Sequence, residues 1–133
     1  MSSTLEFFMP MVPPRTTAQQ HRILKSGRVV PGPKVTEAKR KLIAHLYQHK
    51  PHKPISGPIQ LTTVWKWGRK QSASYEWKTT RPDTDNLQKL LKDCMSELNF
   101  WNDDAQVVDE HIIKLWTNET PGIFITINTP EKL

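Results

Sequence analysis

The sequence predicts an α/β protein of the α+β type, in which one small mixed β-sheet packs against two main helices. Three observations carry this prediction: apolar residues alternate over residues 59–67, leucines recur at helical spacing over residues 87–98, and two further strand-like segments close the chain. The expected order of the main elements is β-α-β-α-β-β. A chain of 133 residues with 36% hydrophobic side chains can bury one core, so residues 1–133 are expected to form a single domain.

The N-terminal half opens with a short apolar run. Thr4–Met9 (TLEFFM) alternates like a strand, and the prolines that follow end it. The basic segment 15–34 is interrupted by glycine and proline, which predicts a long loop with a short hairpin near Arg28–Val30. Apolar residues spaced by three and four positions then predict a helix over residues 36–49, closed by two prolines.

The remaining strands are predicted from alternation. In Ile59–Trp67 every second residue falls on one face, which indicates a half-buried strand. Residues 68–80 are polar and basic and are expected to form an extended loop or hairpin arm. Residues 105–116 and 123–127 read as two strands joined by a turn, so we expect a C-terminal β-hairpin.

The second helix is the clearest element of the sequence. Its apolar stripe runs through residues 87–98 at the spacing i, i+3, i+4, i+7 and i+11. Asp85 is a good N-cap, and Gln88 three residues later completes a capping-box pattern. A turn over residues 99–104 then leads into the next strand.

The composition excludes several classes of protein. One cysteine rules out a disulfide framework and a multi-cysteine zinc site, and it fits a reducing cytosolic compartment. No apolar run approaches the roughly 20 residues of a membrane span, and the N-terminus lacks a signal-peptide pattern. We therefore expect a cytoplasmic protein with neither a membrane nor a small-molecule cofactor as partner.

The formal net charge of +6 combines two opposite regions. Residues 82–110 hold eight acidic side chains and two lysines, whereas residues 15–53 hold ten basic side chains and one glutamate. Basic surface favours a polyanion such as DNA, and a local group of carboxylates would repel it unless a cation lies between them. The expected DNA contacts are Arg15, Arg22, Lys25, Arg28, Lys34, Lys66, Arg69, Lys70, Lys78 and Arg81.

Aromatic residues lie among these basic side chains. Trp67, Tyr75 and Trp77 could stack on unpaired bases of a nucleic acid. Packing in a core or a dimer interface is the alternative for all three.

Two pairs of aspartates flank the second helix. Asp83 and Asp85 stand at its entry, and Asp103 and Asp104 follow it. About 13 helical residues rise roughly 20 Å, so the chain must return antiparallel to the helix. The two pairs meet only if the chain doubles back or if they belong to two subunits, and both possibilities stay open. Carboxylate oxygens are the ligands that Mg²⁺ and Mn²⁺ prefer.

Lys89 lies one helical turn after Asp85, where it could contact a phosphate oxygen or stabilise the charge that develops in phosphoryl displacement. A bound metal lowers the pKa of water, so this group of residues fits phosphodiester hydrolysis. A purely structural role also fits, with Asp85 capping the helix and Lys89 as its (i, i+4) partner. Spacing alone does not choose between the two interpretations.

Residues 81–108, RPDTDNLQKLLKDCMSELNFWNDDAQVV, closely resemble the RusA family of Holliday junction resolvases. That family has a D-x-D-N-L-x-K helix start followed by a D-D-x-Q-V strand start at this separation. A looser resemblance covers most of the chain. The resemblance implies a RusA-like homodimer that is Mg²⁺-dependent, with Mn²⁺ as a substitute, and that resolves four-way DNA junctions in phage-type DNA recombination and repair.

By position, the resemblance implies that Asp83, Asp85 and Asp104 bind the metal and that Lys89 is the catalytic lysine. A C₂ dimer would bring two identical sites to a two-fold junction that needs two nicks. Two alternatives are a non-catalytic branched-DNA-binding protein and a metal nuclease that cuts flaps or single strands. Supporting roles are expected for Asn86, Asp93, Asp103 and Gln106.

Overall fold

The computed structural model describes residues 4–15, 21–71 and 74–133; for residues 21–23, 30 and 31 it describes the backbone only. The expected α+β class and the order of the main elements are confirmed. The elements are β1 (Thr4–Pro10), β2 (His21–Ile23), β3 (Val29–Pro31), α1 (Pro33–Tyr47), β4 (Ile59–Gly68), β5 (Glu76–Trp77), α2 (Thr84–Glu97), the single 3₁₀ turn η1 (Asp104–Gln106), β6 (Val107–Thr117) and β7 (Gly122–Asn128).

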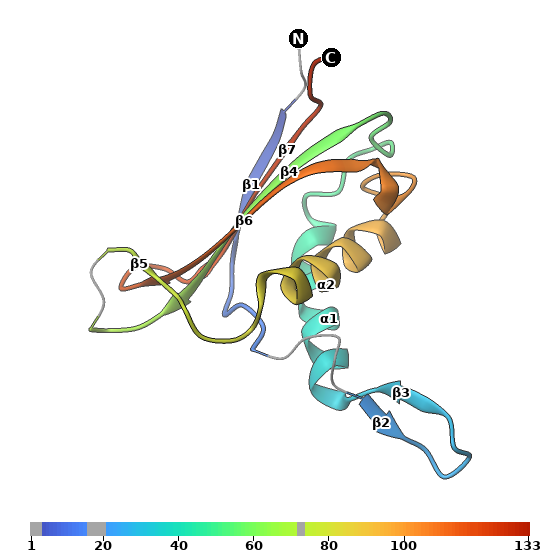
Figure 1. Ribbon diagram of the computed structural model, residues 1–133, viewed down its shortest axis with the longest axis vertical. Coiled ribbons are helices and arrows are strands. Elements are labelled where there is room, and N and C mark those ends of the chain that lie inside the picture. Colours follow the sequence, from blue (N-terminus) through green and yellow to red (C-terminus); the bar gives the residue numbers. More distant parts are fainter. Residues whose placement is uncertain (1–3, 16–20, 72–73) are drawn as a thin grey trace.

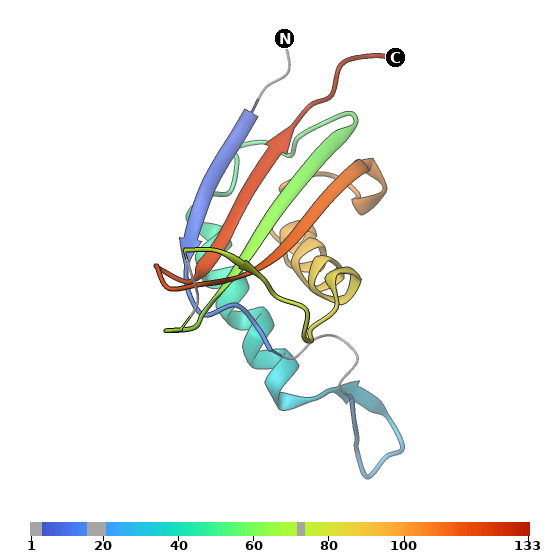
Figure 2. The same cartoon turned by 60° about the vertical axis from the view of Figure 1, so that its left-hand side comes forward.

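Five strands form the main sheet in the order β1-β7-β4-β6-β5. The pairing of β4 with β6 is parallel, and the other pairings are antiparallel. Because β4, α2 and β6 form a parallel crossover, α2 runs back along the sheet between two strands of the same direction. Figure 2 shows the four long strands side by side with both helices behind them.

The predicted C-terminal hairpin is wrong. Both strands form, but β4 lies between β6 and β7 and takes hydrogen bonds from each. Alternation in a sequence reports which face of a strand is buried, and it carries no information about which strand lies alongside. The β4–α2–β6 crossover places β6 on one edge of β4, and β7 takes the other edge next to β1.

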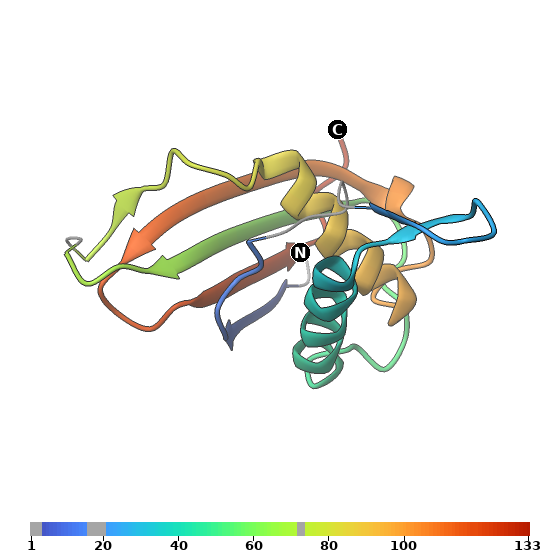
Figure 3. The same ribbon diagram turned by 90° about the horizontal axis from the view of Figure 1, so that it is seen from below.

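The core lies between the sheet and the two helices, which cover one face (Figure 3). Alternate residues of β4 from Ile59 to Trp67 are buried, as the alternation predicts. Burying each large apolar side chain contributes about 1.5–3 kcal/mol. The buried helix residues are Val35, Ala38, Leu42 and Leu46 of α1 and Leu87, Leu90, Leu91, Cys94 and Met95 of α2.

The start of α2 differs from the expected one. Asp83 is the N-cap, with extended φ and ψ of −74° and 150°, and Asp85 lies in the first turn. Gln88 makes no capping box, because its side chain is buried and accepts a hydrogen bond from the Thr63 hydroxyl at 2.9 Å. Asn99, which the structure holds at φ 59°, turns the chain after α2 in a conformation that asparagine tolerates.

The expected hairpin in the basic loop is also present. Strands β2 and β3 pair antiparallel and extend away from the body of the molecule beyond the start of α1 (Figure 1). Residues 16–20, which were expected to belong to the same loop, lie outside the described residues. Among the helices of the described chain, none combines the length and apolar character needed to cross a membrane.

Candidate functional site

Two of the predicted acidic residues stand at the N-terminal end of α2. The backbone carbonyl of Asp83 accepts the hydrogen bond of Leu87 N at 3.1 Å and so begins the helix. Its side chain makes no capping hydrogen bond and is exposed to solvent. Asp85 is also exposed, and both carboxylates therefore remain accessible to a ligand.

Asp104 lies at the opposite end of α2, in η1. Its Oδ1 accepts a very short hydrogen bond from the hydroxyl of Ser96 in the last turn of α2 and another from Trp101 Nε1 at 3.0 Å. Trp101 Nε1 also donates to the Ser96 hydroxyl at 2.8 Å. Because both donors act on one oxygen, they orient the carboxylate and leave the second oxygen for other contacts.

The turn that carries Asp104 is held by a capping box. The Asp103 side chain accepts from Ala105 N at 2.8 Å, and Gln106 Oε1 accepts from the backbone N–H groups of residues 102 and 103 at 2.8 and 2.9 Å. Gln106 Nε2 donates to the carbonyls of residues 55 and 57, both at 2.9 Å. Gln106 thus ties the turn that carries Asp104 to the loop at residues 55–57.

A cavity of about 410 Å³ lies along α2, between it and β6. Asp85 and Asp104 line it from the two ends of the helix, with Lys89 between them. Asp83 is not part of its lining. We call this space the acidic cavity; its lining residues are Thr84, Asp85, Gln88, Lys89, Lys92, Asp93, Asp104, Glu110 and Ile112.

Ion pairs order part of the lining. Lys92 Nζ lies 2.7 Å from a Glu110 oxygen, and Lys89 Nζ lies 3.7 Å from an Asp93 oxygen. The (i, i+4) partner of Lys89 is therefore Asp93, and Asp85 stays outside this pair. The four carboxylates and two lysines of the lining leave two negative charges in excess, which one divalent cation would neutralise.

The donor set fits a hard divalent cation, because carboxylate oxygens are its preferred ligands. Within residues 4–15, 21–71 and 74–133, no three His, Cys, Asp or Glu side chains converge closely enough to hold a metal between them. Mg²⁺ keeps several waters and usually takes one or two carboxylates together with substrate phosphates, so a single carboxylate can contribute to its binding. Asp85 and Asp104 are separated by most of the length of α2, roughly 16 Å at 1.5 Å per residue, so within one chain they would serve separate cations.

Gln88 is a lining residue that sequence reasoning assigned to a helix cap. Its Oε1 accepts from Thr63, whose hydroxyl oxygen also accepts from Trp65 Nε1 at 2.9 Å. Its Nε2 is buried and has no hydrogen-bond partner among the described residues. In the sequence, the sign that Gln88 could be buried was its place directly after Leu87 in the leucine stripe. Such a buried amide group is free to donate to a ligand oxygen in the cavity.

The basic residues expected to contact DNA occupy different environments. Lys25 and Arg28 are exposed in the β2–β3 hairpin, and Lys70 and Arg81 are exposed in loops. Lys66 packs over the Phe8 and Tyr75 rings. Arg22 lies in β2, and its side chain is outside the described part.

Two basic residues are engaged by the protein itself. Arg69 pairs with Glu76 and lies over the Trp116 ring. Lys78 is only 7% exposed, and its ammonium faces oxygen atoms of the chain, so in this structure it is not part of the surface that DNA could reach.

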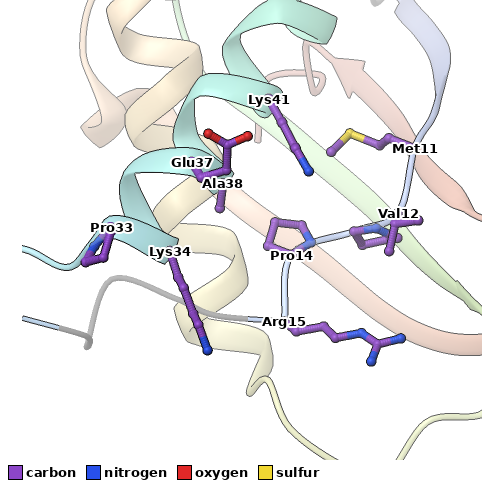
Figure 4. A pocket seen from close by; sticks show the side chains of 10 residues that line it. Met11, Val12, Pro14, Arg15, Pro33, Lys34, Glu37, Ala38 and Lys41 are labelled. Atoms are coloured by element: carbon purple, nitrogen blue, oxygen red, sulfur yellow. The ribbon is translucent and has the colours of Figure 1, made fainter.

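A second cavity, of about 400 Å³, lies between the segment after β1 and the first half of α1 (Figure 4). Met11, Pro13, Pro14 and Ala38 give it an apolar lining. Its cations are Arg15, Lys34 and Lys41, while Glu37, at its edge, pairs with Arg40. Arg15 and Lys34, both expected to contact DNA, thus lie at one place although 19 residues separate them.

A carboxylate-lined cavity with lysines at its side, in a basic chain, is compatible with the class of metal-assisted enzymes that act on nucleic acids. Comparison with known proteins identifies the family within this class. The sequence profile described as Endodeoxyribonuclease RusA matches residues 10–128, nearly the whole chain. The chain therefore belongs to the RusA family of endodeoxyribonucleases.

Individual relatives agree with the family. The chain is 34% identical over 112 residues to the crossover junction endodeoxyribonuclease of Lactococcus phage r1t, which covers 81% of this chain and 84% of that protein. It is 43% identical over 47 residues to the enzymes of the same name from Escherichia coli K12 and Enterobacteria phage 82, which covers 35% of this chain and 39% of each relative. The resemblance identified from residues 81–108 is confirmed.

Proposed function

We propose that the protein is an Mg²⁺-dependent, structure-selective endodeoxyribonuclease that resolves four-way DNA junctions, with a role in recombination and repair. The observation that carries the proposal is the acidic cavity, where Asp85, Asp104 and Lys89 line one space in a chain of the RusA family. The relatives from Lactococcus phage r1t and Escherichia coli are named crossover junction endodeoxyribonucleases. A cytoplasmic location, in a bacterium or a phage-infected cell, belongs to the same proposal.

The residues of the cavity divide the chemistry among them. A divalent cation supplies an acidified water and neutralises phosphate charge when it is bound. Asp85, together with Asp83, would hold a cation at the N-terminal end of α2, and Asp104, whose carboxylate Ser96 and Trp101 keep oriented, would serve a cation at the other end of the cavity or one shared with a second copy of the chain. Lys89 is 67% exposed at its side chain, which lets its ammonium turn from Asp93 towards a phosphate oxygen and stabilise the negative charge that develops there.

Asp83 is proposed as the third metal-binding carboxylate. It lies two residues before Asp85 and outside the lining of the acidic cavity. Its exposed carboxylate can reach a cation held near the N-terminal end of α2, or a cation shared with a second copy of the chain. Junction resolution needs two nicks in opposed strands, and a C₂ homodimer would supply two sites in the matching symmetry.

The proposed DNA contacts lie on parts of the molecule outside the lining of the acidic cavity. The exposed cations of the β2–β3 hairpin and the cations of the second cavity would bind phosphates without regard to sequence. The exposed Tyr75 and Trp77 would stack on bases left unpaired at the branch point, while Trp67 is 1% exposed and belongs to the core.

One assay tests the proposal. The wild-type protein is incubated in Mg²⁺ with a four-way junction, a flap, a nicked duplex and a linear duplex, and nicks are mapped on denaturing gels. We expect paired nicks in the four-way junction and little cutting of the other three. Equal cutting of all four would refute the resolvase assignment, and preference for the flap would favour a flap nuclease.

Asp85→Asn and Asp104→Asn separate the enzyme from a protein that only binds branched DNA. Each amide keeps the shape of the carboxylate and removes its charge, so junction binding should persist while cleavage falls by at least about a hundredfold. Glu131→Gln, which removes a charge from the exposed C-terminal residues, is the matched control and should cleave normally. Unchanged cleavage by both site variants would contradict the proposed site.

A further inference from the structure

Two lysines hold the segment that leads into Asp83. Lys114 Nζ donates to the carbonyl oxygens of Thr80 and Pro82, at 2.7 and 2.6 Å. Lys78 Nζ donates to the Thr80 hydroxyl at 2.5 Å and to the Arg81 carbonyl at 2.6 Å. Three consecutive carbonyls, those of residues 80–82, are therefore turned towards two neighbouring ammonium groups.

The sheet fixes where these ammonium groups stand. Lys114 belongs to β6, and its carbonyl accepts the hydrogen bond of Lys78 N at 3.1 Å. The Lys78 ammonium lies 4.5 Å from the centre of the Trp116 ring and 5.1 Å from that of Trp67, whose faces attract a cation. Lys114 is thus held in a strand of the sheet, and Lys78, the residue after β5, is bonded to that strand and lies over two tryptophan rings of the sheet.

This arrangement disfavours the charged form of Lys78. Burial lowers the pKa of Lys78, and the positive charges of Lys114, Arg15 and Arg69 lower it further. A buried ammonium is usually paired with a carboxylate. Here both ammonium groups donate to carbonyl and hydroxyl oxygens of residues 80–82. Their hydrogen bonds therefore stabilise the conformation of that one segment.

The held segment ends one residue before Asp83. On its other side, the Asp83 carbonyl is bound by Leu87 N as the first hydrogen bond of α2. The backbone of Asp83 is therefore fixed from both directions, by Lys114 through Pro82 and by the helix itself.

We propose that Lys78 and Lys114 are positioning residues, which hold the carbonyls of residues 80–82 and thereby set the place of the Asp83 carboxylate relative to Asp85 for binding a divalent cation. The inference rests on the proposed metal-binding role of Asp83. It gives Lys78 a function other than the DNA contact expected from the sequence. It also assigns a role to Lys114, for which the sequence pattern suggested none.

The test uses Lys114→Met, which keeps the apolar stem and removes the ammonium group. Lys114→Arg is the conservative variant, since a guanidinium can donate to the same carbonyls. Lys50→Met, at an exposed lysine near the Tyr47 ring, is the matched control. Mn²⁺ binding to each full-length protein without DNA is measured by titration calorimetry, together with the Mn²⁺ concentration that gives half-maximal junction nicking.

We expect Lys114→Met to raise the half-saturating Mn²⁺ concentration about tenfold in both measurements, and Lys114→Arg to restore most of it. Junction binding in metal-free buffer should stay within about twofold of the wild type, because the hydrogen bonds of the Lys114 ammonium go to backbone carbonyls of its own chain. Wild-type Mn²⁺ binding by a folded Lys114→Met protein, even one with a lower Tm, would overturn the inference and leave the lysines a purely structural role.

Two further variants complete the test. Lys114→Gln keeps one donor group and replaces Lys114→Met if the latter does not fold; unchanged Mn²⁺ binding by it would count equally against the inference. Asp83→Asn distinguishes a failure of the proposed metal-binding role of Asp83 from a failure of the positioning role of the lysines. Wild-type Mn²⁺ binding and nicking by Asp83→Asn would remove Asp83 from the proposed function, whereas an inactive Asp83→Asn beside a fully normal Lys114→Met would remove only the role of the lysines.

Discussion

Ser96→Ala should weaken cleavage more than it weakens the fold. The Ser96 hydroxyl is one of two groups that donate to Asp104 Oδ1. Removing it leaves Trp101 Nε1 bonded to the same oxygen at 3.0 Å, so no buried polar atom of the trio loses its last partner. The variant therefore isolates the orientation of one carboxylate.

The magnitude follows from the kind of bond. A hydrogen bond to a charged group contributes about 1.5–3 kcal/mol, and the surviving Trp101 bond retains part of the orientation, so the lower figure applies. A loss of about 1.5 kcal/mol in the transition state corresponds to roughly tenfold slower cleavage, since about 1.4 kcal/mol is a factor of ten. The free energy of unfolding should fall by only about 1 kcal/mol, because in the unfolded wild-type chain both groups of this bond form hydrogen bonds with water instead.

Single-turnover nicking of a four-way junction at saturating Mg²⁺ measures the first quantity, and urea unfolding measures the second. Ser56→Ala, in the exposed part of the loop before β4, serves as the control for loss of a hydroxyl. A Ser96→Ala protein that nicks at the wild-type rate would refute the reasoning, because it would show that the orientation of the Asp104 carboxylate by Ser96 has no part in catalysis.

Three other predictions concern different parts of the molecule. Burial raises the pKa of the Cys94 thiol from an ordinary 9.0 to about 12, so above pH 9 the unfolded chain loses this proton before the folded protein does. Between pH 9 and 11 the free energy of unfolding of the wild type, measured in urea, should therefore fall by about 1.4 kcal/mol per pH unit relative to that of Cys94→Ala. The same dependence on pH in both proteins would contradict this prediction. Gln106→Ala removes four hydrogen bonds, two within the Asp104 turn and two that tie this turn to the carbonyls of residues 55 and 57. Their loss should lower the free energy of unfolding by about 2–4 kcal/mol in the same assay and slow nicking, and a loss below about 1 kcal/mol would contradict the tie. Trp77 is 74% exposed, so Trp77→Ala should keep the wild-type Tm but bind a four-way junction about tenfold more weakly in gel-shift titrations, and an equal loss on linear duplex would argue against stacking at the branch point.

The elements with a strong period were predictable from the sequence. Alternation placed the buried face of β4 from Ile59 to Trp67, and the leucine stripe placed the core face of α2. Both depend on side chains within one segment, because a strand or helix repeats its geometry every two or 3.6 residues. The family resemblance likewise came from residues 81–108, which are contiguous in the chain.

The relations between segments were not predictable. The expected hairpin of β6 and β7 failed because β4 lies between them, and hydrogen-bonding partners across a sheet leave no periodic trace in either strand. The cap of α2 fell on Asp83 instead of Asp85, because Gln88, which would complete the box with Asp85, is drawn into the core by Thr63. Local propensity lost to tertiary packing at both places.

By itself, the sequence determined which residues we propose for the chemistry: a carboxylate-rich window, a lysine one turn into a helix, and a basic remainder. Only the tertiary structure decided how they meet. The β4–α2–β6 crossover brings Asp85 and Asp104 to opposite ends of one cavity, while Asp83 is left beside it. It also turns Lys78 inward, onto the carbonyls before Asp83. The reason is that charge and residue type are properties of single positions, whereas distance and burial arise from contacts between segments far apart in the chain.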